Sequence, residues 1–471
     1  MRRSHPRSFR AQANALRRQF LQDGELPFTD VLTDQLLSQA LATIDGWLDR
    51  IFSPLVTLWV FLAQVLSPDH SCRAAVARLN AHRVARGQAP CSARTGAYCR
   101  ARQRLPEEFF SAAARAVGRG LDDRADRRWL WKGRRVYLFD GTTVTMPDTP
   151  ANQAAYPQVY NQGPGVGFPI ARLGAVISLA CGAVVNLGFS RYAGKGEGEV
   201  SLLRQLWDVL RPGGVLVGDR LMSGWAGMHL LKARGVDTVS RLSAHRRADF
   251  RKGTRLGKDD HLVVWRKPTS IRSVDRPTYN ALPDAITVRE ARVRVAQPGF
   301  RTRSVVVVTT LLDPEQTTKE ELADVYRARW HNELDLRSLK STMQMAELRS
   351  KTPEAVRKEV WAHVLAYNLI RTVMAQAAAR HEIPPRSVSF KGAMQTLGAF
   401  EPLLALGSAR DEVARRDLYH LVLDAIATHR VGDRPDRFEP RLKKRRKDYC
   451  GWFTKPRAEL KRRMAKGSTE K

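Results

Sequence analysis

The sequence predicts a mixed α/β fold, with a central sheet, a β-rich insertion and helical regions toward both ends of the chain. In the middle of the chain, short apolar runs of strand type alternate with segments of helical spacing. Toward the ends, apolar residues recur mainly at helical intervals. A chain of 471 residues with 43% hydrophobic residues exceeds one ordinary core, so we expect several domains.

The first part of the chain, up to about Leu105, is expected to be helical. The apolar spacing in Leu32–Trp47 and Ile51–Leu66 is typical of helices. Met1–Phe20 is polar and rich in arginine, and it contains no apolar signal region. We therefore expect a solvated helix or basic arm at the start, and a protein that stays inside the cell.

Strands and helices are mixed from Arg134 onward. The predicted segments are, in order, the strand Val136–Asp140, a hairpin of Ala171–Ala180 and Ala183–Ser190, the helix Glu199–Leu210, the strand Val215–Val217 leading into Asp219, and the helix Ser223–Ala233. This order indicates an α/β core with a central sheet.

The stretch from Ser243 to Ser304 interrupts that alternation. It is rich in Arg, Lys and Pro, and its strand-like runs, His261–Trp265 and Ile286–Val295, predict an inserted β-rich subdomain. The core is expected to resume with the strand Val305–Thr309. The helices predicted after it are Lys319–Met345, Pro353–Ala379 and Ala409–Arg430.

The charge balance points to a polyanionic partner. The chain carries 79 Lys and Arg against 47 Asp and Glu, a formal net charge of +32. Nucleic acid is favoured over a membrane surface, because the apolar stretches Ile51–Leu66 and Gly174–Phe189 are shorter than the roughly 20 residues of a membrane span. The first basic surface is expected at Arg73, Arg78, Arg83, Arg86, Arg94, Arg100, Arg102 and Arg104. A solvated helix face is the alternative for these arginines.

These patterns divide the chain into five predicted regions. They are a helical, basic DNA-binding region (1–110), the first part of the core (130–242), the β-rich insertion (243–304), the second part of the core (305–381), and a helical C-terminal region (382–471) that ends in a disordered basic tail with Lys443–Lys447 and Lys461–Arg463.

Two aspartates follow apolar strands of the predicted core. Asp140 ends one strand and Asp219 follows another. Carboxylates at the ends of neighbouring strands can meet at one edge of a sheet, where they suit Mg²⁺, which prefers hard oxygen ligands. The alternative for each residue is a cap of the next turn.

One predicted helix carries an unusual polar stripe. On a regular helix, Tyr326, Arg329, Glu333 and Lys340 fall within roughly 60° of one another, with Trp330 and Arg337 near the same stripe. A carboxylate framed by two cations and a phenol suits a metal ion beside phosphates. The alternative is an exposed helix whose Glu333 forms salt bridges with Arg329 or Arg337.

These blocks resemble the DDE transposases of the insertion sequence 4 family. The spacing of Tyr326, Arg329, Glu333 and Lys340 matches the family's Tyr-Arg-Glu-Lys signature at every position, and Asp140–Gln153 and Gly218–Arg220 are similar to its first-acid and second-acid blocks. The likeness extends from about residue 95 to 441.

The resemblance implies a ribonuclease-H-like core and metal-dependent DNA cleavage and strand transfer. Asp140, Asp219 and Glu333 would hold two Mg²⁺ or Mn²⁺ ions. The DNA contacts expected from the resemblance and from position are Tyr326, Arg329, Lys340, Arg220, Trp330 and Arg337. The partners would be double-stranded transposon ends, target DNA and a second copy of the chain, in the bacterial cytoplasm at the nucleoid, without a membrane or nucleotide cofactor. A catalytically idle DNA-binding descendant and a stand-alone nuclease are the alternatives.

Other candidates carry weaker signals. Trp265 and Trp330 are candidates for stacking on a flipped base, with core packing as the alternative. His82 and His331 are expected to be ordinary surface histidines. The five cysteines lack metal-ligand spacing. The glycine-rich Gly194–Glu199 departs from nucleotide-binding patterns, and we expect a loop that leads into a helix near DNA.

Overall fold

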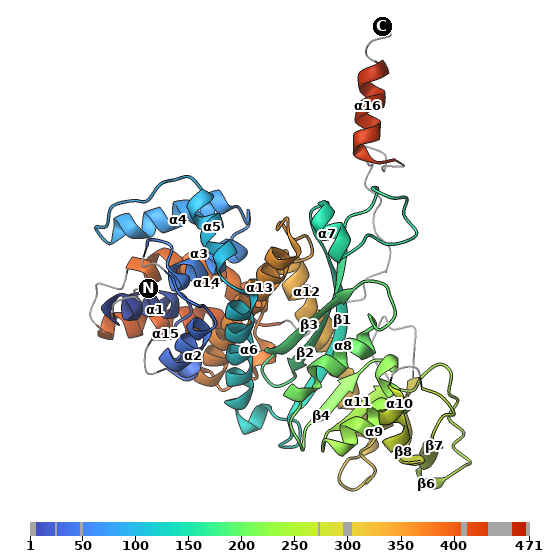
Figure 1. Ribbon diagram of the computed structural model, residues 1–471. Coiled ribbons are helices and arrows are strands. Elements are labelled where there is room, and N and C mark those ends of the chain that lie inside the picture. Colours follow the sequence, from blue (N-terminus) through green and yellow to red (C-terminus); the bar gives the residue numbers. More distant parts are fainter. Residues whose placement is uncertain are drawn as a thin grey trace.

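The computed structural model describes residues 6–23, 26–47, 50–271, 274–294, 304–406, 412–431 and 455–467. Within these ranges the protein has a mixed α/β architecture, with a helical body on one side of a long sheet (Figure 1). The predicted tail residues Lys443–Lys447 lie outside the described residues. Lys461–Arg463, predicted to be disordered, lie on the helix α16 (Arg457–Gly467).

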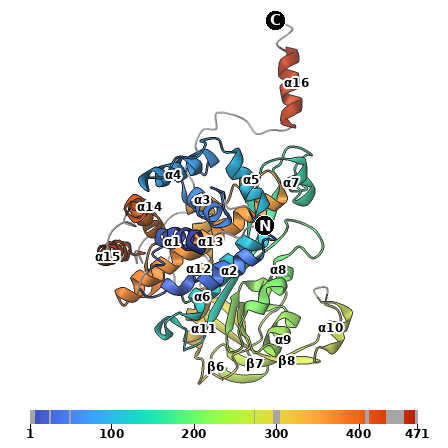
Figure 2. The ribbon, with the colours of Figure 1, turned by 60° about the vertical axis from the view of Figure 1, so that its left-hand side comes forward.

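The helical body combines helices from before the sheet with helices that follow it in the sequence. Its N-terminal helices are α1 (Pro6–Gln19), α2 (Asp34–Ala42), α3 (Pro54–Leu66), α4 (Cys72–Ala85), α5 (Gly96–Arg104) and α6 (Glu107–Asp123). α1, α2, α3 and α6 pack with α13 (Pro353–Arg380), α14 (Phe390–Leu406) and α15 (Glu412–Thr428) around one apolar core, whereas α4 and α5 pack on α3 around a second, smaller one. Figure 2 shows these helices gathered into one body. The sequence placed most of these helices in three separate regions, 1–110, 305–381 and 382–471, whereas the fold joins them.

Local sequence signals explain where several of these helices begin. Thr33, Ser53 and Ser71 cap α2, α3 and α4, each with a side-chain oxygen that accepts a hydrogen bond from a first-turn amide. The apolar helix α3 is buried, and no helix in the described part of the chain is long and apolar enough to cross a membrane. The apolar stretch Ile51–Leu66 is therefore explained by core packing.

The sheet has nine strands in the order β3-β2-β1-β4-β5-β9-β8-β7-β6. The strands are β1 (Val136–Thr145), β2 (Ile170–Ser178), β3 (Val184–Arg191), β4 (Val215–Gly218), β5 (Asp237–Arg241), β6 (Thr254–Gly257), β7 (Asp260–Arg266), β8 (Ala285–Arg294) and β9 (Ser304–Thr309). β1, β4 and β5 are parallel neighbours, and the remaining pairs are antiparallel. The strands of the predicted insertion thus continue the same sheet through β9.

Both faces of the sheet centre are covered. On one face, Leu138, Val217 and Val239 pack with Leu322 and Val325 of α11 (Lys319–Arg327). On the other face, Phe139 and Leu216 pack with leucines of α8 (Glu199–Leu206). Because successive side chains of a strand point to opposite faces, this alternation fixes the face on which each later residue of β1 and β4 lies.

The predicted long helix Lys319–Met345 is interrupted, so a single regular stripe on it was a wrong expectation. α11 ends at Arg327, α12 spans Trp330–Arg337, and a π-helical turn follows over Ser338–Thr342. The Ser338 hydroxyl donates to the Leu334 carbonyl at 2.9 Å, which competes with the regular ladder. The Met343 amide then donates five residues back, to Ser338.

Candidate active site

Asp140 and Asp219 lie at the same level of two neighbouring parallel strands. Leu138 of β1 pairs with Val217 of β4. Asp140 lies two residues after Leu138, and Asp219 lies two residues after Val217. Both aspartates therefore face the side of the sheet that α11 covers. β1 continues to Thr145, so Asp140 lies within the strand and not at its end, contrary to the sequence expectation. β4 ends at Gly218, and this leaves the edge beside Asp140 open.

Backbone amides orient both aspartates. The Gly141 amide donates to Oδ1 of Asp140 at 2.8 Å, and the Leu221 amide donates to Oδ1 of Asp219 at 2.7 Å. Asp219 is also the cap of the short helix η4 (Arg220–Ser223), as the alternative for strand-terminal aspartates predicted. Capping does not exclude a second role, because a carboxylate has lone pairs beyond those that one amide uses.

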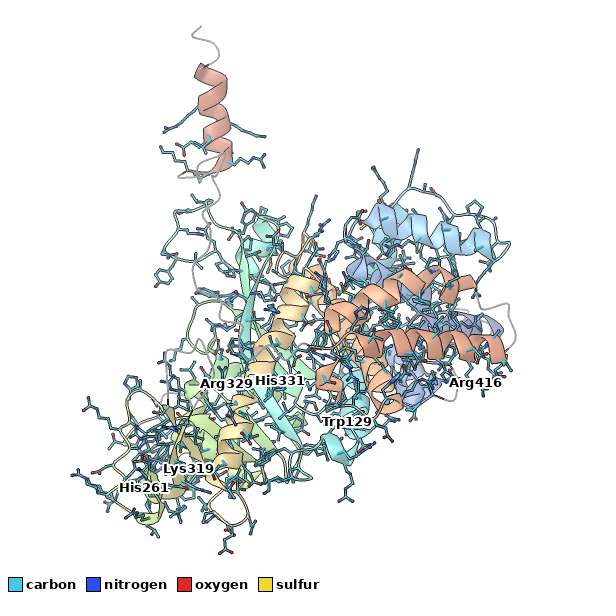
Figure 3. The ribbon with its side chains drawn as sticks, turned by 180° about the vertical axis from the view of Figure 1, so that it is seen from behind. Trp129, His261, Lys319, Arg329, His331 and Arg416 are labelled. Carbon is cyan, nitrogen blue, oxygen red and sulfur yellow. The ribbon has the colours of Figure 1, made fainter. Side chains whose placement is uncertain are left out.

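Glu333 reaches the same place from α12 through Arg329. The Arg329 guanidinium lies 3.0 Å from Oε1 of Glu333 and 3.7 Å from Oδ2 of Asp140, and it is less than a quarter exposed. Burial by itself would lower the pKa of Arg329, but Tyr326, Glu333 and Asp140 raise it. The predicted salt bridge between Glu333 and Arg329 is present, and it also brings Asp140 into contact with the same cation (Figure 3 labels Arg329).

The Asp140 carboxyl is poorly solvated in this arrangement. Burial raises its pKa to about 6, and the nearby acids Glu199 and Asp219 add to the rise, while the Gly141 amide and Arg329 oppose it. Such crowding of acids on a buried edge favours a cation at this point.

Glu199 is a further acid near the site, on the opposite face of β1 from Asp140, and sequence reasoning missed it. It is the first residue of α8, at the end of the glycine-rich loop, and its Oε1 lies 3.2 Å from the guanidinium of Arg172. A Cβ on Gly141 would meet that oxygen at 2.4 Å, so a glycine is required for Glu199 to approach β1. The loop signal was visible in the sequence, but the approach to Asp140 depends on the tertiary structure.

The donor set suits a hard cation, although it is not gathered around one point. Asp140, Asp219 and Glu333 supply carboxylate oxygens, the ligands that Mg²⁺ prefers. Arg329 already acts as a stand-in cation between two of them. Among the described residues, however, no three acidic, histidine or cysteine side chains converge closely enough to hold a metal ion as arranged.

The other predicted site residues lie around this cluster with differing exposure. Tyr326 is half-buried against the apolar core beside Arg329, and burial raises the pKa of its hydroxyl. Burial lowers the pKa of Lys340, which lies on the π-helical turn. Trp330, Arg337 and Arg220 are exposed. Arg220 lines a cleft of about 330 Å³ together with Arg204, Trp207, His245 and Arg246.

Several of the weaker candidates have structural roles. Trp265 is 4% exposed, donates to Glu290 at 3.0 Å and lies under the guanidinium of Arg246, so core packing explains it. His331 and His82 are half-buried and not on the open surface as expected, and burial lowers the pKa of each to about 4.

The predicted basic surface of the N-terminal helices is smaller than the sequence suggested. Arg73, Arg94, Arg100 and Arg104 are exposed. Arg102 instead packs 3.9 Å above the Phe61 ring, and its guanidinium donates to Gln64. Arg78 and Arg83 are hydrogen-bonded to main-chain carbonyls at 2.9 and 2.8 Å. Part of the arginine pattern therefore stabilises the helical body.

Comparison with known proteins gives a consistent family. Residues 131–369, slightly more than half of the chain, match the family described as the transposase DDE domain. The chain is 28% identical over 358 residues to the transposase InsG for insertion sequence element IS4 from Escherichia coli (strain K12), covering 74% of this chain and 76% of that protein.

Two further similarities are a shorter match to a curated protein and one solved structure. The putative transposase InsL for insertion sequence element IS186A from the same organism is 34% identical over 99 residues, or 21% of this chain and 26% of that protein. A structure of the piggyBac transposase synaptic complex with hairpin DNA aligns with a TM-score of 0.43 at 11% identity, covering 86% of each chain.

Proposed function

Because the chain belongs to the transposase DDE domain family and is a DNA transposase of the IS4 type, we propose that Asp140, Asp219 and Glu333 are its catalytic acids. The observation that carries this proposal is the shared cation: Arg329 lies between Asp140 and Glu333, while strand register sets Asp219 beside Asp140. Transposases of this family use divalent metal ions. We propose two Mg²⁺ or Mn²⁺ ions for this protein, held by these three carboxylates.

The residues around the acids prepare the site for DNA. When bound, the two ions would activate a water or a 3′-hydroxyl and stabilise the leaving oxygen during in-line displacement. Loading the site requires Arg329 to leave the space between Asp140 and Glu333. A DNA phosphate is the natural new partner for its guanidinium, since Arg pairs with phosphate through two parallel hydrogen bonds.

A wider DNA surface follows from the exposed residues. On the helical side, Trp330 and Arg337 are exposed, whereas Tyr326, Arg329 and Lys340 are half-buried, and the exposed Arg220 lines the cleft next to Asp219 in the sequence. We propose that the exposed arginines of α4 and α5 read or hold the transposon ends. Together with the net charge of +32, these surfaces favour double-stranded DNA as the partner.

The proposal also includes a ribonuclease-H-like core and a pair of protomers. The parallel order β1-β4-β5 beside an antiparallel hairpin supports a ribonuclease-H-like core. Pairing of two DNA ends by two protomers is carried over from the family, and it calls for a test by the mass of the protein–DNA complex.

An assay of excision and strand transfer tests the assignment. The substrate is the DNA that flanks the gene, with Mg²⁺, and the variants are Asp140→Asn, Asp219→Asn and Glu333→Gln. Each is expected to bind DNA but not to cut it. Glu320→Gln, which removes an exposed acid from α11, is the matched control and should cut normally. Cleavage by the three variants at the parental rate would refute the proposal, and cleavage without joining by the parent would indicate a nuclease.

A further inference from the structure

The helix that carries Glu333 has little apolar support of its own. α12 is short, is preceded by a tight turn at Ala328–Arg329 and is followed by the π-helical turn. Its buried residues are Asn332, Asp335 and Leu336, so two of the three are polar. The side-chain amide of Asn332 makes no hydrogen bond within the described part of the chain. The orientation of α12 therefore depends strongly on Asp335.

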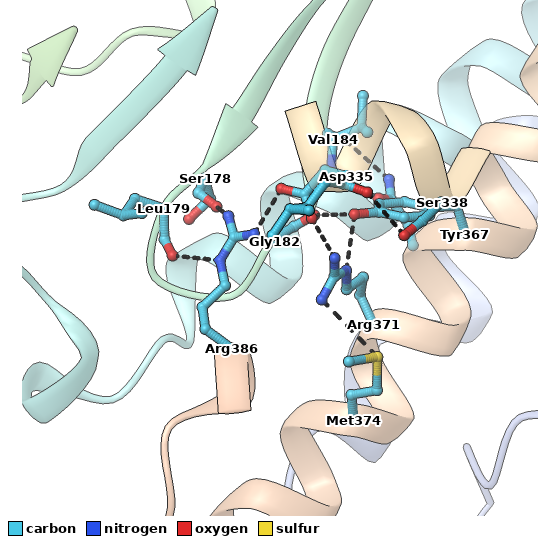
Figure 4. Close-up of polar contacts among 12 residues, drawn as sticks. Ser178, Leu179, Gly182, Val184, Asp335, Ser338, Tyr367, Arg371, Met374 and Arg386 are labelled. Carbon is cyan, nitrogen blue, oxygen red and sulfur yellow. Dashed lines mark hydrogen bonds and ion pairs between the residues drawn. The ribbon is translucent and has the colours of Figure 1, made fainter. Parts of the chain in front are cut away.

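Asp335 lies at the centre of a buried ionic network (Figure 4). Its side chain is 1% exposed, and its two oxygens bind two arginines from other elements. Oδ1 accepts from Arg371 of α13, and Oδ2 accepts from Arg386 at 2.6 Å. Arg386 belongs to the short helix η6 (Pro385–Ser387). Both carboxylate oxygens thus have charged partners, which is the arrangement that a buried carboxylate requires.

The two arginines extend the network to the turn of the β2–β3 hairpin. Arg386 donates to the carbonyls of Leu179 and Ser178 at 2.8 and 2.7 Å. Arg371 donates to the Tyr367 hydroxyl at 2.8 Å, which in turn donates to the Gly182 carbonyl at 3.0 Å. We call Asp335, Arg371, Arg386 and Tyr367 the Asp335 clamp.

The hairpin turn is shaped to admit the clamp. Gly182 has a φ of +79°, and a Cβ there would lie 2.8 Å from the Arg371 guanidinium carbon. Any larger residue would push Arg371 away from Tyr367 and Asp335. The close approach of the turn and the guanidinium leaves little freedom for α12 to shift relative to the hairpin.

The clamp reaches both halves of the proposed active site. β2, which enters the clamped turn, pairs along its length with β1, and Ala175 of β2 is opposite Asp140. On the helical side, Glu333 is two residues before Asp335, so the two carboxylates leave α12 on nearly opposite faces. One face is fixed in the clamp, and the other presents Glu333 to Arg329 and Asp140.

From this geometry we infer that Asp335 is a positioning residue for Glu333, which it holds at the height and rotation needed opposite Asp140 and Asp219. The inference rests on the proposed function of Glu333. Asp335 touches neither substrate nor acids and acts through the backbone of α12. Sequence reasoning missed it, because an aspartate on a charged helix reads as a solvated residue.

Two variants separate positioning from mere stability. Asp335→Asn keeps the shape but leaves two buried guanidinium groups around a neutral amide, which risks unfolding. Arg386→Lys keeps the charge but replaces by a single nitrogen the three guanidinium nitrogens that reach Asp335 and the two hairpin carbonyls. Arg380→Lys is the matched control, because Arg380 pairs with Asp424 on the surface of the same helical body.

The measurements are the single-turnover cleavage rate at saturating DNA, its dependence on Mg²⁺, the Kd for flanking DNA and the urea unfolding midpoint. For Arg386→Lys we expect the rate to fall by about tenfold or more and the half-saturating Mg²⁺ concentration to rise. The Kd for DNA should stay within about twofold of the parental value. The urea unfolding midpoint should show that the variant is fully folded in the assay buffer. Asp335→Asn should show the same pattern with a larger loss, and Arg380→Lys should resemble the parent.

Different results would contradict the positioning role of Asp335 and the catalytic role of Glu333. A folded Arg386→Lys that cuts at the parental rate with parental Mg²⁺ dependence overturns the inference, even if its stability is lower. If Asp335→Asn fails to fold, Arg386→Lys decides. Cleavage by Glu333→Gln in the same assay would instead refute the proposed function itself, so the two failures are distinguishable.

Discussion

The two halves of the proposed active site are built by different kinds of structure. Asp140 and Asp219 belong to neighbouring strands, so main-chain hydrogen bonds of the sheet set their relative height. Glu333 belongs to a short helix whose buried residues are mostly polar, and side-chain contacts across the fold hold it in place. The sheet half of the site is therefore preset, whereas the helical half depends on charges that can be altered one at a time.

The largest expected effect comes from removing an acid from either half. Asp140→Asn and Glu333→Gln should each lower the cleavage rate by at least about a hundredfold, the scale found when one transition-state contact is lost from an active site. The rate under single-turnover conditions with Mg²⁺ measures it. If Asp140→Asn lowered the rate and Glu333→Gln did not, Glu333 would not belong to the active site, and the site would have no helical half.

The next largest effect is the pH dependence of metal binding at Asp140, in the sheet half of the site. The pKa of Asp140 in the metal-free protein is raised to about 6 from 3.8. A neutral Asp140 therefore stabilises the metal-free fold below pH 3.8, and this stability is lost as the pH rises through 6. Since a bound cation requires the ionised carboxylate, Mn²⁺ affinity should weaken by about tenfold per unit below pH 6. Binding of Mn²⁺ to DNA-free protein from pH 5 to 8 tests this.

Glu199→Gln sharpens the same measurement. Because Glu199 raises the pKa of Asp140, its removal should shift the Mn²⁺ binding curve toward lower pH. An unchanged curve would show that Glu199 does not act on Asp140 in solution.

A smaller effect is expected at mildly acidic pH, which should loosen the helical half of the site but not the sheet half. Burial, together with Arg386, lowers the pKa of His331 to about 4 from 6.5. The neutral histidine thus contributes stability that is present above pH 6.5 and is lost as the pH falls toward 4. Once the direct effect of pH on amide exchange is corrected for, the amides of α12 should exchange faster at pH 5 than at pH 7, while the amides of β1 stay protected. His331→Asn should remove most of that difference, and equal loosening of β1 would contradict it.

The smallest effect is expected from single exposed arginines. Arg73→Gln or Arg100→Gln should weaken DNA binding only several-fold and should reduce the salt dependence of the binding constant by about one counterion each. A salt titration of binding measures the slope. Arg102→Gln is the informative contrast, because that side chain is packed on Phe61 and its loss should lower stability more than DNA affinity.

Much of the sheet could be predicted because its signals are local. The hairpin about Cys181 and Gly182, the buried strand before Asp219 and the strand Val305–Thr309 occur where the period of the apolar residues placed them. The long helix Lys319–Met345 was a wrong prediction, because the helix breaks between Arg327 and Trp330 and again at the π-helical turn. At that turn the Ser338 hydroxyl competes with the main-chain ladder, and a hydrophobic pattern does not register such a contact.

The sequence by itself determined the types of residue at the site and the family to which the chain belongs. Residue identity and spacing are local properties, and the Tyr326 to Lys340 signature keeps its spacing whether or not the helix is regular. Only the tertiary structure decided which charges meet. Arg329 lies between two acids, Glu199 packs against Gly141 of β1, and Asp335 pairs with arginines from two other elements. Such contacts join residues far apart along the chain, and they depend on burial and distance, which no local pattern records.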